Sequence, residues 1–460
     1  MEKLFGTDGI RGIANKELTC ELAMNAARAT AVVLADNKGK GQSPQKRRTK
    51  ILVGKDTRLS CDMLEGALVA GLCSAGVDTV LLGVLPTPAV AFLTKKYEAD
   101  AGIMISASHN PYNFNGIKIF EGNGYKLSDE MEFKIEEAVA YTKKISLKSQ
   151  NLAGSEGRVF FKKNALRDYI DHIKKSVGFS LDGPKVAFDC SNGAASYSAK
   201  ILFEELNCQC KMLFCHPNGV NINKDCGSIY LENLSNFVKN NDVDLGIAFD
   251  GDADRCLAVD ENGDIVDGDA IMAMCAADMK SRGKLSKNTV VGTIMTNLGF
   301  VRFCDKNEIN FIPAEVGDKY VLREMLREDF NLGGEQSGHV IFKDFATTGD
   351  GQLTAGILLG VINKRRQKLS KLTEVLKKFP QASINIEASR EQKLRVKNDK
   401  NLLAIIKEAQ QKLGDAGRII VRPSGTEPFI RVMMEWENSC EIDNFLNKFA
   451  LEIKKKLANT

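Results

Sequence analysis

The chain has 460 residues, of which 43% are apolar and 27% charged, and its formal net charge is +4. This composition is typical of a soluble globular protein, and the length allows about three domains or four small ones. The weak net charge argues against nucleic acid or an anionic membrane surface as a partner, and no apolar window is long enough to span a membrane. The start of the chain has no signal-peptide core and the 12 cysteines form no Cys-x-x-Cys pair, so we expect a cytoplasmic protein with reduced thiols.

A first alternation of strand-like and helical runs begins at residue 50. Residues 50–54 have a strand pattern, a helical stretch follows from Asp62, and strand patterns return at 77–85 and 101–105. The last run ends at a polar motif, Ser-Ala-Ser-His-Asn-Pro, over residues 106–111. We expect this motif to lie on the loop after a buried strand.

The alternation then occurs twice more. The second pass has strand patterns at 185–188, 208–215 and 245–249, a helix at 194–206, and ends at an acidic loop, 250–255. The third pass has strand patterns at 289–292, 310–313 and 331–333, a helix at 299–306, and ends at a polar loop, 334–339. Because ligands gather beyond the carboxyl ends of strands in α/β sheets, the three motifs predict three walls of one cleft.

The last part of the chain differs from these three passes. Its predicted order is a helix, a strand, a tight loop, a strand and a final helix, at residues 401–413, 418–421, 422–428, 429–436 and 441–457. We therefore predict three consecutive α/β domains with mixed, largely parallel sheets around a central cleft, plus a smaller C-terminal α+β domain covering it. The expected domains are 1–155, 156–258, 259–372 and 373–460, with linkers near 146–157, 260–264 and 369–380.

The acidic loop carries Asp250, Asp252 and Asp254 on alternate positions. Three carboxylates so close repel one another unless a cation lies among them, and hard oxygen ligands suit Mg²⁺ or Ca²⁺. Glu261, at the twelfth position, gives a partial EF-hand spacing, but Arg255 occupies the position where that motif requires glycine. Arg255 is better explained as a guanidinium directed at a phosphoryl oxygen. We also expect the acidic loop to be exposed to solvent.

Ser108 lies in the first polar motif, with His109 beside it and Lys118 on the next predicted strand. A serine hydroxyl needs a base, a metal or prior modification to become reactive. A Ser-His-acid hydrolase is the obvious alternative, but the Gly-x-Ser-x-Gly elbow is absent and a histidine adjacent in sequence is poorly placed as a base.

Further motifs indicate phosphate and sugar recognition. The loop at 422–428 combines a guanidinium, hydroxyls and a glycine in a pattern suited to an anion, and the segment 6–12 presents Arg11 on a glycine-rich loop. Glu335 and Ser337 offer groups suited to sugar hydroxyls, whereas His339 fits a core position equally well. No P-loop is present, so the sequence shows no seat for a nucleotide cofactor.

Taken together, these four ordered motifs resemble the α-D-phosphohexomutases, from Phe5 to the C-terminal domain. The resemblance implies four domains that carry, in order, the phosphoserine, the metal loop, the sugar loop and a phosphate site. It implies that Ser108 is the phosphoserine and that one Mg²⁺ binds to it and to Asp250, Asp252 and Asp254. It implies catalytic roles for Ser108, His109, Lys118, Arg255 and Arg11, with Lys118 the expected general acid or base. It implies substrate contacts from Glu335, Ser337, Arg422, Ser424, Gly425, Thr426 and Arg431.

The substrate is predicted from smaller similarities. The segments 218–223, 226–228 and 316–318, and Gln336 in the sugar loop, resemble the branch that interconverts glucosamine 6-phosphate and glucosamine 1-phosphate, feeding UDP-N-acetylglucosamine synthesis. The alternatives are the phosphomannomutase/phosphoglucomutase branch, a metal-dependent sugar-phosphate phosphatase and a non-catalytic phosphosugar sensor. We expect a monomer or homodimer with no nucleic-acid or membrane partner.

Overall fold

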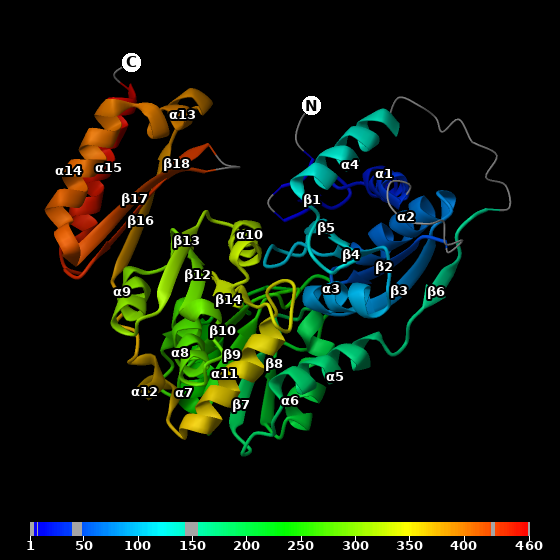
Figure 1. Ribbon diagram of the computed structural model, residues 1–460, viewed down its shortest axis with the longest axis horizontal. Helices are drawn as coiled ribbons and strands as arrows, with labels where there is room; N and C mark the ends of the chain where they lie inside the picture. The colour runs from blue at the N-terminus through cyan, green and yellow to red at the C-terminus, as the bar shows by residue number, and fades with distance from the viewer. Residues whose placement is uncertain (1–3, 7, 39–47, 143–154, 425–427, 459–460) are drawn as a thin grey trace. The chain divides into compact units, whose positions relative to one another are not determined.

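The computed structural model describes residues 4–6, 8–38, 48–142, 155–424 and 428–458 (Figure 1). The chain divides into two compact units: residues 1–295 with 309–374, and residues 296–308 with 375–460. The first unit contains three sheets and the second contains one. No helix among the described residues is long and apolar enough to cross a membrane.

The first sheet has six strands in the order β1-β5-β4-β2-β3-β6. The strands are β1 (Ile10–Ile13), β2 (Lys50–Lys55), β3 (Asp78–Val84), β4 (Ala101–Ile105), β5 (Phe114–Glu121) and β6 (Val159–Phe161). The helices are α1 (Cys20–Lys38), α2 (Cys61–Ser74), α3 (Thr87–Lys96) and α4 (Asp129–Thr142). All five residues of β4 are buried, as expected for a strand covered on both faces. The polar motif Ser106–Pro111 therefore follows directly after the carboxyl end of this buried strand.

The second sheet has five strands in the order β11-β10-β9-β7-β8. The strands are β7 (Lys185–Asp189), β8 (Gln209–Leu213), β9 (Leu245–Phe249), β10 (Cys256–Val259) and β11 (Ile265–Val266). The helical elements are α5 (Ala165–Val177), the 3₁₀ turn η1 (Ala194–Tyr197), α6 (Ala199–Glu205) and α7 (Glu232–Asn240). Strand β9 is buried throughout and ends at the acidic loop.

The third sheet has four strands in the order β13-β12-β14-β15. The strands are β12 (Thr289–Thr293), β13 (Asn310–Ala314), β14 (Leu332–Gly334) and β15 (Val340–Phe342). The helical elements are α8 (Gly268–Ser281), η2 (Ser286–Asn288), α10 (Asp318–Glu328), α11 (Gly351–Arg365) and α12 (Leu369–Thr373). The turn between β14 and β15 carries Glu335 and Ser337.

The second unit is built on a three-stranded antiparallel sheet in the order β16-β18-β17. Its strands are β16 (Gln381–Glu387), β17 (Gly417–Pro423) and β18 (Phe429–Trp436). Its helical elements are α9 (Leu298–Lys306), α13 (Arg390–Asn398), α14 (Lys400–Leu413), η3 (Gly414–Ala416) and α15 (Ile442–Ala458). Buried Glu435 binds α9 to this sheet, accepting from the Leu298 N–H at 2.8 Å.

The predicted fold class, with three α/β sheets of mixed direction and a smaller C-terminal α+β domain, is confirmed. Two local expectations are wrong. The helix expected over 194–206 is interrupted at Ser198, where the 3₁₀ turn η1 ends and α6 begins, and the Ala194 N–H at its start donates to Gly251 O at 2.8 Å. The linker expected at 260–264 is the turn of the β10–β11 hairpin. We propose that the second domain extends to Val266 and the first to Phe161, since β6 pairs with β3.

Candidate active site

Ser108 lies on the connection between β4 and β5, and it is 1% exposed. Its backbone has φ of +53°, a left-handed conformation that is uncommon for serine. Its Oγ donates to Asp250 Oδ2 at 2.6 Å and lies 3.3 Å from His109 Nδ1. The structure therefore brings together the first polar motif and the acidic loop, which are 142 residues apart in sequence.

A buried arginine and an asparagine hold the backbone of this loop. Arg58 pairs with Asp56 at 2.9 Å, and its guanidinium donates to the carbonyls of Ser108 and Asn110, both at 2.8 Å. From the second sheet's side, Asn223 Nδ2 donates to the same two carbonyls, at 2.8 and 3.0 Å. Sequence analysis assigned no role to Arg58 or Asn223, although Asn223 ends the 218–223 segment.

The three aspartates of the acidic loop are buried, with exposed fractions of 0%, 0% and 4% for Asp250, Asp252 and Asp254. The expectation of an exposed loop is therefore wrong: the loop packs so tightly that a Cβ on Gly251 would lie 2.6 Å from Ser108 O. One carboxylate oxygen of each aspartate lies within 4.8 Å of those of the others.

This donor set fits a hard divalent cation. Asp252 Oδ1 and Asp254 Oδ1 are buried, and within the described ranges no donor reaches them. Buried carboxylate oxygens without a partner are costly. Burial, and next the charges of Asp254 and Asp252, hold the pKa of Asp250 well above its usual range. A cation among the three would satisfy the open oxygens and remove the repulsion.

Lys118, on β5, is buried among carboxylates. Its Nζ lies 2.7 Å from Asp252 Oδ2, 2.9 Å from Asp8 Oδ2 and 3.4 Å from Asp254 Oδ2. Burial alone would lower the pKa of Lys118, but these carboxylates, Asp252 foremost, hold it well above its usual value. Lys118 is therefore an ammonium ion in this state.

A second lysine extends this network to the third sheet. Lys126 Nζ donates to Asp8, at 2.5 Å, and to Asp318 at the start of α10. His339 lies between Asp318 and Asp254, at 3.6 and 3.7 Å. His339 is buried, and although burial would lower its pKa, Asp254 and Asp318 raise it. The sequence left His339 open as a core residue and did not identify Asp8 or Lys126.

His109 differs from His339, because its surroundings lower its pKa instead of raising it. Burial, followed by the charges of Arg255 and Arg11, lowers the pKa of His109 to about 4. His109 is therefore a neutral imidazole at neutral pH. Both guanidiniums have a buried Nε with no hydrogen-bond acceptor among the described residues, so each has a donor available to an anionic ligand.

The loop after β14 lies close to the acidic loop. Glu335 accepts from the Gly317 N–H at 3.2 Å, and burial raises its pKa. The Gly338 carbonyl accepts from the Cys256 N–H at 3.0 Å, which ties this turn to the strand that follows the acidic loop. Ser337 is half-buried in the same turn.

In the second unit, Arg422 on β17 lies directly opposite Arg431 on β18. Burial, and then the charge of Arg431, lower the pKa of Arg422. Two like charges opposite each other on neighbouring strands are unfavourable unless an anion is shared between them. Ser424 follows Arg422, and its N–H donates to Phe429 O at 2.8 Å. The predicted contacts of Gly425 and Thr426 lie outside the described residues.

Comparison with known proteins identifies the family. Four domain families of phosphoglucomutase/phosphomannomutase match in order: α/β/α domain I at residues 2–146, domain II at 167–263, domain III at 267–379 and the C-terminal domain at 384–452. The chain belongs to the phosphohexomutase family. Its members are isomerases that transfer a phosphoryl group within a sugar phosphate, so this phosphohexomutase is an enzyme.

Full-length relatives and solved structures agree with this assignment. The chain is 47% identical to the phosphoglucosamine mutases of Clostridium acetobutylicum and Acetivibrio thermocellus, over 99% of this chain and 100% and 98% of theirs. The fold matches a phosphoglucomutase/phosphomannomutase family protein from Burkholderia thailandensis, with a TM-score of 0.81 and 22% identity over 100% and 98% of the two chains. It also matches N-acetylphosphoglucosamine mutase of Aspergillus fumigatus, with a TM-score of 0.68 and 16% identity over 98% and 95%.

Proposed function

We propose that this phosphohexomutase is a phosphoglucosamine mutase, which interconverts glucosamine 6-phosphate and glucosamine 1-phosphate through a phosphorylated Ser108. The observation that carries the proposal is the 2.6 Å hydrogen bond from Ser108 Oγ to Asp250, within a cluster of three buried carboxylates. The substrate follows from the 47% identical relatives, which are named as phosphoglucosamine mutases.

The bound cation is proposed to be one Mg²⁺ per chain, held by Asp250, Asp252, Asp254 and the phosphate on Ser108. When bound, it would neutralise charge on the transferring phosphoryl group. The Aspergillus fumigatus relative, in its solved structure, is in complex with magnesium and GlcNAc-6P, which supports this choice.

In the transfer step, the bond between phosphorus and Ser108 Oγ breaks while a sugar hydroxyl oxygen forms a bond to the same phosphorus. Lys118, which begins the cycle as an ammonium ion, is proposed to donate its proton to the departing Ser108 Oγ. The neutral amine that remains then takes up the proton that the sugar hydroxyl loses, so that Lys118 ends the step as an ammonium ion again. The open Nε–H donors of Arg255 and Arg11 are proposed to bind the phosphoryl oxygens, and neutral His109 to orient Ser108 Oγ.

The product of the first transfer is a sugar bisphosphate, which must turn end over end so that Ser108 recovers the other phosphate. We assign sugar hydroxyl binding to Glu335 and Ser337. Arg422 and Arg431, which lie opposite each other on β17 and β18, are proposed to bind the phosphate that is not reacting, with Ser424, Gly425 and Thr426.

A direct assay tests the substrate. Purified protein incubated with Mg²⁺ and glucosamine 6-phosphate should form glucosamine 1-phosphate, with turnover on mannose and glucose phosphates much slower. Turnover confined to mannose or glucose phosphates would overturn the proposed substrate and indicate the phosphomannomutase/phosphoglucomutase branch.

The cellular setting is also a proposal. We propose that the enzyme works in the cytoplasm, as a monomer or homodimer, and supplies glucosamine 1-phosphate to UDP-N-acetylglucosamine synthesis. The reduced, largely buried cysteines and the small net charge support this setting.

A further inference from the structure

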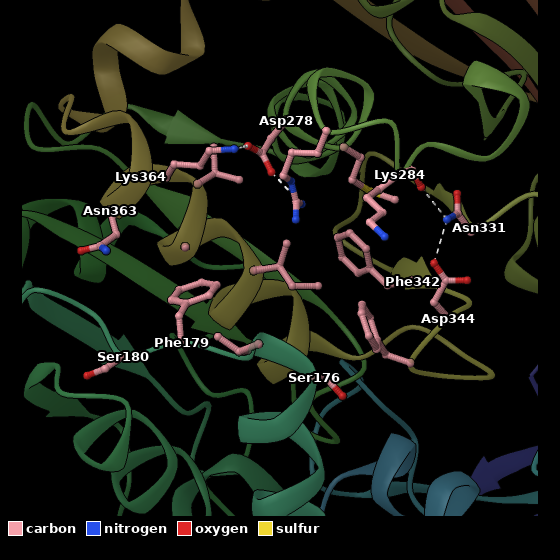
Figure 2. A pocket seen from close by; sticks show the side chains of 17 residues that line it. Ser176, Phe179, Ser180, Asp278, Lys284, Asn331, Phe342, Asp344, Asn363 and Lys364 are labelled. Carbon is pink, nitrogen blue, oxygen red and sulfur yellow. Dashed lines mark hydrogen bonds and ion pairs between the residues drawn. The ribbon is translucent and has the colours of Figure 1, made fainter.

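A cavity of about 630 Å³ lies in the first unit and is lined by none of the residues assigned to phosphoryl transfer (Figure 2). Its walls come from the end of α5, the end of α8, the segments around β14 and β15, and the second half of α11. Small-molecule sites in proteins have volumes of roughly 300–1,000 Å³. The cavity is therefore large enough for a ligand with one or two rings.

The cavity lies at the far ends of two helices that begin at the catalytic loops. The first residue of α11, Gly351, donates its N–H to Ala253 O in the acidic loop at 3.0 Å, whereas Lys364 near the helix end lines the cavity. Thirteen residues of helix span about 20 Å at 1.5 Å per residue. Similarly, α8 begins with Gly268, whose N–H donates to Gln336 O in the sugar loop at 3.0 Å, and it ends at the cavity.

Aromatic and aliphatic side chains form most of the cavity wall. Phe342 and Met279 are buried, whereas Phe179 and Phe345 are 43% and 40% exposed. A Cβ on Gly360 of α11 would lie 2.0 Å from Phe179 Cζ and 2.9 Å from both Cε atoms, so the tip of the Phe179 ring points at that helix. Exposed aromatic rings that converge on one hollow offer stacking surfaces to a planar ligand.

The charges around the cavity leave one lysine available. Asp278 accepts from both Arg282 and Lys364, at 2.7 and 2.8 Å, and Asp344 accepts from Asn331 at 2.7 Å. Within the part of the chain that the structure describes, no carboxylate lies within 4.0 Å of Lys284 Nζ. In Figure 2, Lys284 lies on the same side of the cavity as Asn331 and Asp344. The residues that line the cavity thus include two carboxylates and three cations, and Lys284 is the third cation.

The backbone of Lys284 is fixed at this position. Its N–H donates to Met279 O at 2.8 Å, and its carbonyl accepts from Asn331 Nδ2 at 2.9 Å. The ammonium group is therefore presented from an anchored turn instead of a free loop. This arrangement complements a ligand with one negative charge at the edge of an aromatic ring.

We infer that this cavity is a regulatory site for a small aromatic anion. The ligand's ring lies between Phe179, Phe342 and Phe345, and its anionic group contacts Lys284. Bound there, it joins the ends of α8 and α11, the two helices whose first residues contact the sugar loop and the acidic loop. Binding thereby changes turnover without competing with the sugar phosphate.

Calorimetric titration of the full-length enzyme with 1-naphthalenesulfonate tests the binding site. We expect one saturable site per chain, whose affinity does not change when glucosamine 6-phosphate is present. Its uncharged analogue, 1-naphthalenesulfonamide, should bind about tenfold more weakly, because it cannot form the charge-assisted contact with Lys284.

Two variants locate the site. Lys284→Met should weaken the sulfonate about tenfold and leave the sulfonamide unchanged, since only the charge is removed. Phe345→Ala should weaken both probes, and because Phe345 is 40% exposed the variant should fold normally. The matched control is Lys407→Met, at an exposed lysine on α14, which should bind both probes as the wild type does.

The regulatory half of the inference has its own measurement. Saturating 1-naphthalenesulfonate should change kcat at saturating glucosamine 6-phosphate by at least about twofold, an effect absent from Lys284→Met. Absence of saturable binding, displacement by the sugar phosphate, or equal affinity in Lys284→Met would overturn the site. Normal binding with an unchanged kcat would overturn the regulatory role. The calorimetric result does not depend on the proposed activity.

Discussion

Asn223 is the side chain by which the second domain holds the backbone of the proposed phosphoserine. Its two hydrogen bonds to the Ser108 and Asn110 carbonyls supplement those of Arg58, which is itself fixed by Asp56. Ser108 needs such support because its left-handed backbone is strained. The 218–223 segment, noticed in the sequence as a substrate-branch similarity, thus contacts the phosphoserine loop.

Replacing Asn223 should therefore impair catalysis more than substrate binding. We expect Asn223→Leu to lower kcat by about tenfold or more while KM changes less than about twofold, because the loss lies in the positioning of the phosphoryl donor. Steady-state kinetics measures this. Asn233→Leu is the control, since the exposed Asn233 side chain donates to Asp225 O in the same domain, at 2.7 Å; an equal loss of kcat in both variants would contradict the positioning role.

Asp250 is expected to destabilise the fold when no cation is bound. Its raised pKa shows that burial and its two acidic neighbours penalise its ionised form. In EDTA, Asp250→Asn should therefore melt at the same temperature as the wild type or at a higher one. Mg²⁺ should stabilise the wild type by about 2.7 kcal/mol at a concentration of 100 times Kd, and Asp250→Asn should lose this stabilisation. A variant that Mg²⁺ stabilises as fully as the wild type would exclude Asp250 as a ligand.

At the scale of elements, two loops from different sheets meet at Gly251. A Cβ there would lie 2.6 Å from Ser108 O and 2.9 Å from Asn223 Nδ2, so no side chain fits without moving the loops apart. We expect Gly251→Ala to fold but to lose at least about a hundredfold in kcat, because transfer depends on sub-ångström placement. Gly66→Ala is the control, since no atom of the described part of the chain lies within 4 Å of a Cβ at Gly66 on α2. Wild-type activity in Gly251→Ala would refute this packing argument.

The sequence predicted the strand-end motifs well because strand periodicity and loop chemistry are local signals. Strands β4 and β9 are uninterrupted apolar runs, and the loops that follow them carry Ser108 and Asp250. The links between elements had no such signal. Lys126 bonds Asp318 across 192 residues and Asp8 across 118, so neither pairing could be inferred from spacing. Burial of the acidic loop was missed for the same reason, since it depends on packing between sheets.

At the scale of the whole molecule, buried carboxyl groups make stability depend on pH. Asp189 is the last residue of β7 and precedes the loop that contacts Gly251. Burial raises the pKa of Asp189 to about 7, and hydrogen bonds from the N–H groups of Gly227 and Ser191 oppose this rise. The folded state therefore binds a proton that the unfolded state has lost above about pH 4. The stability that this proton provides is present at low pH and is lost as the pH rises through 7.

Thermal unfolding at two pH values tests this contribution. Between pH 5 and pH 8, the wild type should lose about 3 kcal/mol from Asp189. The difference in Tm between these pH values should therefore be smaller in Asp189→Asn than in the wild type, whatever the variant's absolute Tm. Exposed Asp244→Asn should keep the wild-type difference. An unchanged difference in Asp189→Asn would contradict the raised pKa.

The central claim is that Ser108 donates and recovers the phosphoryl group. The most direct measurement uses enzyme carrying labelled phosphate on Ser108, mixed with Mg²⁺ and unlabelled glucosamine 6-phosphate. We predict that the label passes to the sugar phosphates at the rate of turnover, that Ser108 remains phosphorylated, and that Ser108→Ala takes up no label and turns over no substrate. Release of the label as inorganic phosphate in step with substrate loss, or conversion of the sugar while the label stays on Ser108, would contradict the account.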